Sequence, residues 1–351
     1  APYVISEFDP GNFVRLSRNP EYWGADISFR RGTNNFDEIR LDFYADGSVQ
    51  FEAFKAGESS SFRELNAERW ENSYDFDAVA DGHVIKSIIP HQRPSGITGF
   101  VMNTRLPKFK DWRVREALIT AFNFEFINQT NTGGRQNRIT SYYSNSVLSM
   151  KSGAAEGRVL DFLVPHAADL LPGTLEGYTL PQSDGSARNR KNIRIADDLL
   201  NQAGWTVQDG LRRNAQGQAF EIVTVLKQGD TESQSMMDIY QQALERLGIT
   251  LSTEVLDSAQ YKERTQVYDF DMAYYRRGLS LSPGNEQILY WGADGVEKPG
   301  TRNWMGMNSP AAEDMINRLL SSESHDDFLA AARALDRILT AGRYVIPIHS
   351  S

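Results

Sequence analysis

The chain has 351 residues and a formal net charge of −9, with 40% apolar and 24% charged side chains. This length exceeds one ordinary small domain, so we expect two lobes in a globular protein. The acidic charge disfavours nucleic acid and anionic membranes as partners, and no apolar run reaches the ~18 residues of a membrane span. The absence of cysteine excludes disulfides, thiolate metal sites and cysteine nucleophiles.

The first 60 residues predict a small antiparallel sheet followed by a helix. Residues 1–24 are typical of two strands around a Pro-Gly turn, because apolar and polar side chains alternate along them. Trp23 is expected to pack against a core. A third strand is expected at 36–44, and a helix at 46–55 ends in the C-terminal glycine manner at Gly57.

A strand, a polar turn and a helix are predicted over residues 99–121. The helix begins after Asp111. In it Val114 and Leu118 lie four residues apart on one apolar face, whereas Arg115 is expected on another face. The preceding segment, 75–94, is interpreted as strand-rich.

Strands and helices alternate in the rest of the chain. Residues 165–190, rich in Pro, Gly, Ser and Asp, are expected to form a long surface connection. A helix follows at 192–205, with Ile195 and Leu200 facing inward. The further expected elements are a strand at 220–226, a helix at 233–247, a strand at 248–255, a helix at 260–266, a strand at 270–275 and a helix after Pro310. This βαβ-like alternation predicts a mixed sheet with helices on its faces.

The sequence offers no support for catalysis, a metal or a cofactor. None of its five histidines forms an H-E-x-x-H motif, and it contains no G-x-S-x-G, Walker A or G-x-G-x-x-G motif. Adjacent carboxylates such as Asp197 and Asp198 point about 100° apart on a helix, which makes them a poor acid–base pair. We therefore expect a protein that is not an enzyme; a metal-independent hydrolase would need a buried carboxylate pair reached by water.

Several motifs in order carry a resemblance to a known family. They are PYVISEFDPGNFVRLSRNPEYWG (2–24), DEIRLDFYADGSVQFEAFKAGE (37–58), GFVMNTRLPKFKDWRVREALITA (99–121), ALERLGI (243–249) and ARALDRIL (332–339). In wording and order the chain resembles the bacterial extracellular solute-binding proteins of ABC importers, family 5, and most of all their YejA-like subgroup.

The resemblance implies an α/β fold of the periplasmic-binding-protein type (type II, cluster C), with two lobes of mixed β-sheets flanked by helices. It assigns residues 1–98 to the first lobe, 99–343 to the second, and 344–351 to the start of the return to the first. It also implies an internal fragment that lacks the N-terminal third and the C-terminal end of the family.

The implied function is that of the substrate-binding component of an ABC importer. Such a protein captures oligopeptides or peptide-like compounds, microcin C-type compounds among them, between its lobes, and delivers them to an inner-membrane permease. The resemblance further implies a periplasmic monomer without a cofactor. Two alternatives stay open: the same fold binding an oligosaccharide or opine-like conjugate, and a periplasmic peptide chaperone.

The loop at 274–287 is the predicted ligand-lining segment. Arg276 and Arg277 are candidates for contacts with ligand carbonyls or a carboxylate, and a solvated arginine pair is the alternative. In relatives an aspartate of this loop holds the ligand's ammonium group, but the matching position falls near Ser280, which carries no charge. We expect either that Glu286 supplies this negative charge or that the ammonium end of the ligand is not recognised.

Four further residues are candidates for ligand contact. Tyr142 and Tyr143 lie in a polar loop, and Asn303 and Trp304 precede the last predicted helices. For the three aromatic residues, packing in the core is the alternative.

Overall fold

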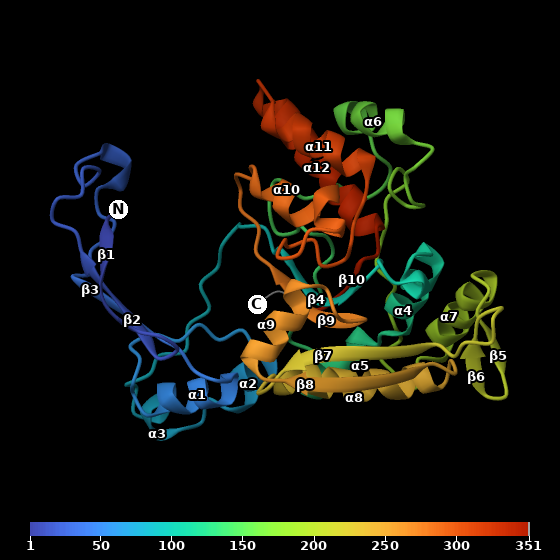
Figure 1. Ribbon diagram of the computed structural model, residues 1–351, viewed down its shortest axis with the longest axis horizontal. Coiled ribbons are helices and arrows are strands. Elements are labelled where there is room, and N and C mark those ends of the chain that lie inside the picture. The colour runs from blue at the N-terminus through green and yellow to red at the C-terminus, as the bar shows by residue number, and fades with distance from the viewer. Residues whose placement is uncertain (350–351) are drawn as a thin grey trace. The chain divides into compact units, whose positions relative to one another are not determined.

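The computed structural model describes residues 1–349, and the chain divides into two compact units, residues 1–62 and residues 63 onward. Both units are seen in Figure 1, and each is described by itself. The predicted division after residue 98 stays a prediction about the lobes of the whole protein.

The first unit is the predicted three-stranded antiparallel sheet followed by a helix. Its strands pair in the order β1-β2-β3. Its elements are β1 (Tyr3–Asp9), β2 (Phe13–Arg18), the 3-10 helix η1 (Ser28–Arg30), β3 (Glu38–Asp42) and α1 (Gly47–Lys55). Helix α1 begins where its sequence predicts, because the Asp46 carboxylate accepts the backbone N–H groups of Ser48 and Val49.

Little of the first unit is buried. Phe51 is the one buried apolar side chain of residues 1–62, whereas large apolar side chains such as Ile5 and Phe8 are exposed. Trp23 is 78% exposed. The expectation that Trp23 packs against a core is therefore wrong, because this unit is a single thin sheet with no layer covering it at that point.

The second unit is built on a five-stranded sheet with the order β10-β4-β9-β7-β8. Strand β4 is antiparallel to both neighbours, and β7 is parallel to β9 and β8. The sheet is therefore mixed, as predicted. The strands are β4 (Ile97–Met102), β7 (Glu221–Lys227), β8 (Thr250–Leu256), β9 (Met272–Arg277) and β10 (Val345–Pro347), and β5 (Thr206–Gln208) and β6 (Leu211–Arg213) form a separate hairpin.

Helices cover both faces of this sheet (Figure 1). On one face lie α4 (Trp112–Ala121), α5 (Phe124–Thr132), α7 (Arg190–Gln202) and α8 (Thr231–Glu245). On the other lie α6 (Gly157–Leu163), α9 (Ser258–Gln266), α10 (Glu286–Trp291), α11 (Pro310–Leu320) and α12 (His325–Ala341). The remaining elements are α2 (Ala67–Asn72), α3 (Asp77–Ala80), η2 (Pro107–Phe109), η3 (Val164–His166) and η4 (Ala293–Val296).

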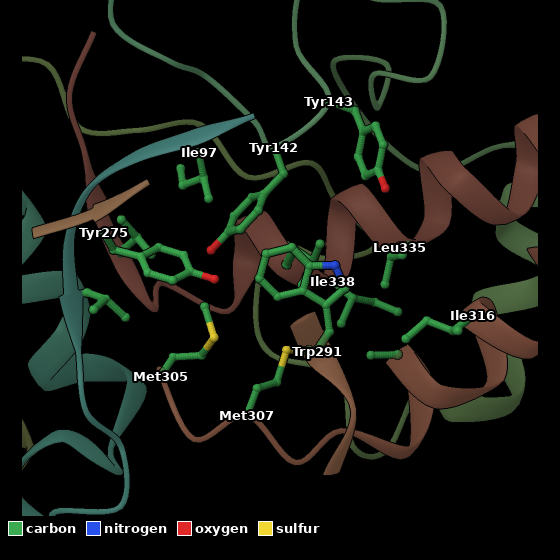
Figure 2. Close-up of a cluster of buried hydrophobic side chains, with 14 of the residues drawn as sticks. Ile97, Tyr142, Tyr143, Tyr275, Trp291, Met305, Met307, Ile316, Leu335 and Ile338 are labelled. Atoms are coloured by element: carbon green, nitrogen blue, oxygen red, sulfur yellow. The ribbon is translucent and has the colours of Figure 1, made fainter. Parts of the chain in front are cut away.

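The sheet thus separates two hydrophobic cores. Along β4, Val101 points into one core, whereas Phe100 and Met102 point into the other, as the two-residue period of a strand requires. We call the core that contains Val101 and Trp291 the first core and the core that contains Phe100 and Leu118 the second core. Figure 2 shows the first core, in which Tyr142 and Trp291 pack together.

The strand-rich interpretation of residues 75–94 is wrong. The structure places the short helix α3 there and no strand, and the side chains of Ile85, Ile88 and Ile89 are exposed. These apolar residues have high intrinsic strand propensity, but a strand also needs a neighbour to pair with, and the described chain supplies none at this point.

One predicted side-chain orientation is also wrong. Ile195 of α7 is exposed, and the buried positions of this helix are Asn192, Ala196 and Leu200. Arg115 of α4 is buried although it carries a charge. Its guanidinium donates to the carbonyl oxygens of Phe109, Lys110 and Gly342 at 2.7–3.1 Å, so a loop that lies 227 residues further along the chain covers it.

No helix among residues 1–349 is both long enough and apolar enough to cross a lipid bilayer.

Candidate functional site

The carboxyl ends of four strands, β7, β8, β9 and β10, meet at one edge of the five-stranded sheet, because these strands run in the same direction. We call it the carboxyl edge. The loop 228–230 leads there from β7 into α8, and the loop 278–285 leads from β9 into α10. In open α/β sheets, ligands bind outside this edge.

Arg276 and Arg277 end strand β9 at the carboxyl edge and point to opposite faces of the sheet. The Arg277 guanidinium lies over the rings of Tyr275 and Tyr290, at 5.1 and 5.2 Å from their centroids. Arg276 is half-buried and forms no ion pair with any described carboxylate. Burial, with the nearby positive charge of Arg63, lowers the pKa of its guanidinium.

A half-buried acidic residue that sequence reasoning missed, Asp230, also lies at the carboxyl edge. Burial raises the pKa of the Tyr274 hydroxyl. The negative charges of Asp230 and Glu232 add to this rise, and the positive charge of Arg276 opposes it. All three charges are therefore near enough to influence this hydroxyl. The Asp230 carboxylate begins α8 by accepting the backbone N–H of Ser233 at 3.1 Å. Burial also raises the pKa of Asp230, and Glu232 adds to that rise.

The carboxyl edge therefore carries two half-buried groups of opposite charge, Asp230 and Arg276, and both influence the Tyr274 hydroxyl. The signal that could have identified Asp230 is its position three residues after a buried parallel strand. Such a position lies at the carboxyl edge whatever the family.

The loop between β9 and α10 is ordered by its own side chains. The exposed Ser280 hydroxyl accepts the backbone N–H of Ser282 at 3.2 Å. The Glu286 carboxylate accepts the backbone N–H of Gly284 at 2.9 and 3.1 Å, so it stabilises the turn that begins α10. Ser280 lies in the loop and Glu286 is the first residue of α10, so both predicted site residues are near the carboxyl edge, and the Glu286 carboxylate is partly occupied by this turn.

Tyr142 and Tyr143 lie in the first core and present no surface to a ligand. The Tyr142 ring meets the Trp291 ring edge-on, with centroids 5.3 Å apart (Figure 2). The Tyr143 hydroxyl donates to Gln287 Oε1 at 2.9 Å, an atom that also accepts the Trp291 indole N–H at 2.8 Å. Tyr143 thus positions α10, the helix that follows the candidate ligand loop.

Asn303 and Trp304 also belong to the scaffold. The fully buried Asn303 side chain donates to the carbonyl oxygens of Gly292 and Met307, at 2.9 and 2.8 Å, and accepts the Met307 N–H. The Trp304 ring packs beside Tyr275, with centroids 5.4 Å apart. Tyr142 and Tyr143 are buried, as the packing alternative expects, whereas Trp304 is half-buried, and a ligand contact of this residue stays a prediction.

Within residues 1–349, no group of three or more His, Asp or Glu side chains is arranged to hold a metal ion. The His166 ring lies 2.9 Å from an Asp314 oxygen, and the His349 ring lies 2.7 Å from a Glu232 oxygen. These are two-residue pairs that join distant segments of the chain.

An α/β scaffold with a polar, charged edge at the carboxyl ends of its strands is an architecture in which ligands commonly bind. Residues 1–298 match the family model of the bacterial extracellular solute-binding proteins, family 5, middle part. The chain belongs to this family.

Three curated relatives are similar over 99% of this chain. A putative binding protein of Brucella melitensis is 39% identical over 349 residues. The peptidoglycan-binding protein YepA of Agrobacterium fabrum is 36% identical over 361 residues, and the probable peptide-binding protein YejA of the same organism is 36% identical over 350 residues. The chain spans 56–58% of the length of these relatives.

Among solved structures, the oligopeptide-binding protein AppA of Bacillus subtilis, in complex with a nonapeptide, is similar with a TM-score of 0.72 and 16% identity. The similarity covers 99% of this chain and 60% of AppA. It confirms the predicted α/β fold of the family.

Proposed function

We propose that the chain is part of the substrate-binding component of an ABC importer that works in the periplasm and binds short peptides or peptide-containing compounds at the carboxyl edge. The cargo then passes to an inner-membrane permease. The names of two relatives, a peptide-binding and a peptidoglycan-binding protein, support a cargo that contains peptide. Microcin C-type conjugates fall within the same chemical class.

The observation that carries this proposal is that two groups of opposite charge, Asp230 and Arg276, lie at the carboxyl edge and both influence the Tyr274 hydroxyl. A peptide is a zwitterion: its ammonium group would pair with Asp230, and its carboxylate with the Arg276 guanidinium, which has no carboxylate partner of its own. Asp230 supplies the negative charge that the loop lacks at Ser280. Arg277 and Glu286 flank the loop and would contact the peptide main chain.

Calorimetric titration with trialanine tests these roles, because each end of the peptide can be blocked separately. N-acetylation should weaken binding to the wild type about tenfold to a hundredfold, and so should C-terminal amidation, because each removes a charge-assisted contact. Asp230→Asn should abolish the discrimination against the acetylated peptide, and Arg276→Gln the discrimination against the amide. Asparagine also caps helices well, so the first variant keeps the start of α8.

Lys151→Gln and Asp326→Asn are the matched controls, because both residues are exposed. They should bind all three peptides as the wild type does. Equal affinity of the wild type for free and blocked peptides would contradict the assigned roles. Tighter binding of an uncharged oligosaccharide than of any peptide would favour the sugar-binding alternative.

A further inference from the structure

A groove lined by arginines lies away from the carboxyl edge. It is formed by the start of α7 and the end of α8 and has a volume of about 670 Å³, within the range of small-molecule sites. Arg188, Arg190, Arg194 and Arg246 line it, with Asp197 as its one carboxylate. Helix α8 begins at the carboxyl edge and its 15 residues span about 22 Å, so the groove is separate from the candidate peptide site. Figure 1 shows α7 at the end of the sheet remote from α9.

The positive charge of this groove is not compensated. The Asp197 carboxylate already pairs with the buried guanidinium of Arg212, and Arg246 donates to the carbonyl oxygens of Ala187 and Arg188. Within residues 1–349, the exposed side chains of Arg188, Arg190 and Arg194 form no ion pair. Three unpaired arginines on a chain with a net charge of −9 are a local reversal of the overall charge.

The backbone adds to the positive potential at this point. Helix α7 has basic residues, Arg190 and Lys191, and no acidic residue in its first turn, where the positive end of the helix dipole lies. Its first residue follows Asn189, whose side chain makes no capping hydrogen bond. Asn189 is only 2% exposed, and its side-chain amide nitrogen has no hydrogen-bond partner.

We propose that the groove binds a phosphate-bearing anion. Guanidinium groups match the oxygens of phosphate with two parallel hydrogen bonds, and a helix N-terminus favours the same charge. Three free arginines suit a phosphate group, which carries up to two negative charges, better than they suit a carboxylate, which carries one. Binding here would relieve the repulsion among the arginines and stabilise the first turn of α7.

The test measures the affinity of the 351-residue protein for inorganic pyrophosphate by calorimetry at low ionic strength. The groove variant is Arg188→Gln/Arg190→Gln/Arg194→Gln, which keeps helix-forming side chains. The control variant, Lys151→Gln/Lys262→Gln/Arg302→Gln, removes the same charge from exposed positions elsewhere. The wild type and the control should bind pyrophosphate with equal affinity, and the groove variant at least tenfold more weakly. Equal binding by all three proteins, or binding by none, would overturn the proposal.

A second arm identifies the source of the phosphate. Vesicles of phosphatidylcholine with 30% phosphatidylglycerol are compared with pure phosphatidylcholine vesicles in a flotation assay. If the anionic vesicles capture the wild type but not the groove variant, the phosphate belongs to a lipid headgroup. If the wild type binds pyrophosphate but is not captured by the vesicles, the phosphate belongs to a soluble ligand. Trialanine titration of the groove variant should match the wild type, which separates a failure of this proposal from a failure of the proposed function.

Discussion

The two units of this chain are both built from regular strands and helices, but different interactions stabilise them. In residues 1–62 one apolar side chain, Phe51, is buried, and exposed ion pairs such as Arg15 with Glu7 at 2.8 Å link neighbouring strands. In the second unit a five-stranded sheet separates two cores. Exposed ion pairs contribute little, and burial of apolar area contributes most, so the second unit should carry nearly all the stability.

This difference teaches that local sequence pattern and stability are separate properties. The strand register of the first unit follows from alternation and a tight turn, and neither requires a core. The first unit should therefore unfold at lower denaturant concentration than the second. Three sets of substitutions test this contrast.

The largest expected difference is between Trp291→Ala and Phe8→Ala. Trp291 is fully buried against Tyr142, so its removal should lower the free energy of unfolding by about 3–5 kcal/mol. Phe8 is 65% exposed, so the same truncation should change it by about 0.5 kcal/mol or less. Urea denaturation followed by far-ultraviolet circular dichroism measures both. A cost above about 2 kcal/mol for Phe8→Ala would show that the first unit has a core of its own.

Asp336 adds a pH dependence that only a well-packed unit can generate. Burial raises its pKa to about 6, although the Ser141 hydroxyl and the Tyr143 and Met150 amides donate to the carboxylate. The folded state thus holds the proton more strongly than the unfolded state. The contribution of Asp336 to the free energy of unfolding is therefore most favourable at pH values below the pKa of the unfolded state. As the pH rises through about 6, this contribution is lost, and the free energy of unfolding falls by roughly 3 kcal/mol.

The measurement for Asp336 is the unfolding free energy of Asp336→Asn against wild type between pH 4 and 7. The variant should lack the decrease of stability with rising pH that Asp336 causes, whereas Asp326→Asn, at an exposed position, should keep it. Parallel pH profiles of the wild type and Asp336→Asn would contradict the assignment.

The smallest expected effects come from two helix caps of the same chemistry. Asp111 caps α4 in the second unit and Asp46 caps α1 in the first. Asp111→Ala should lower the unfolding free energy of the second unit by about 1 kcal/mol. Asp46→Ala should leave that transition unchanged and accelerate hydrogen exchange at the Ser48 and Val49 amides. Replacement by Asn, a good cap, is the control at both positions, and a shared loss of stability would show that the units unfold together.

The motif that carries the family resemblance, Gly99–Ala121, serves the scaffold. The Arg105 guanidinium donates to the carbonyl oxygens of Gly295, Val296, Asn303 and Trp304 at 2.7–3.0 Å. Arg115 clamps the loop after α12 in a similar way. Arg105 and Arg115 thus hold distant segments of this chain together, and their contacts do not indicate what the protein binds.

The sequence alone determined the local structure and the family. Asp111 caps α4 where the sequence predicts the start of a helix, since capping depends on a few neighbouring residues. The predicted mixed sheet is confirmed, because the order of strands and helices restricts the sheets that can form.

Only the tertiary structure decided which side chains are covered. Arg115 is buried by a loop 227 residues away, Ile195 faces outward, and Asp230 and Arg276 both influence the Tyr274 hydroxyl although 46 positions separate them in the sequence. Periodicity indicates which residues share a face, but burial depends on what packs against that face. That information lies in contacts between distant segments, and so does the opposite-charge pair of the candidate site.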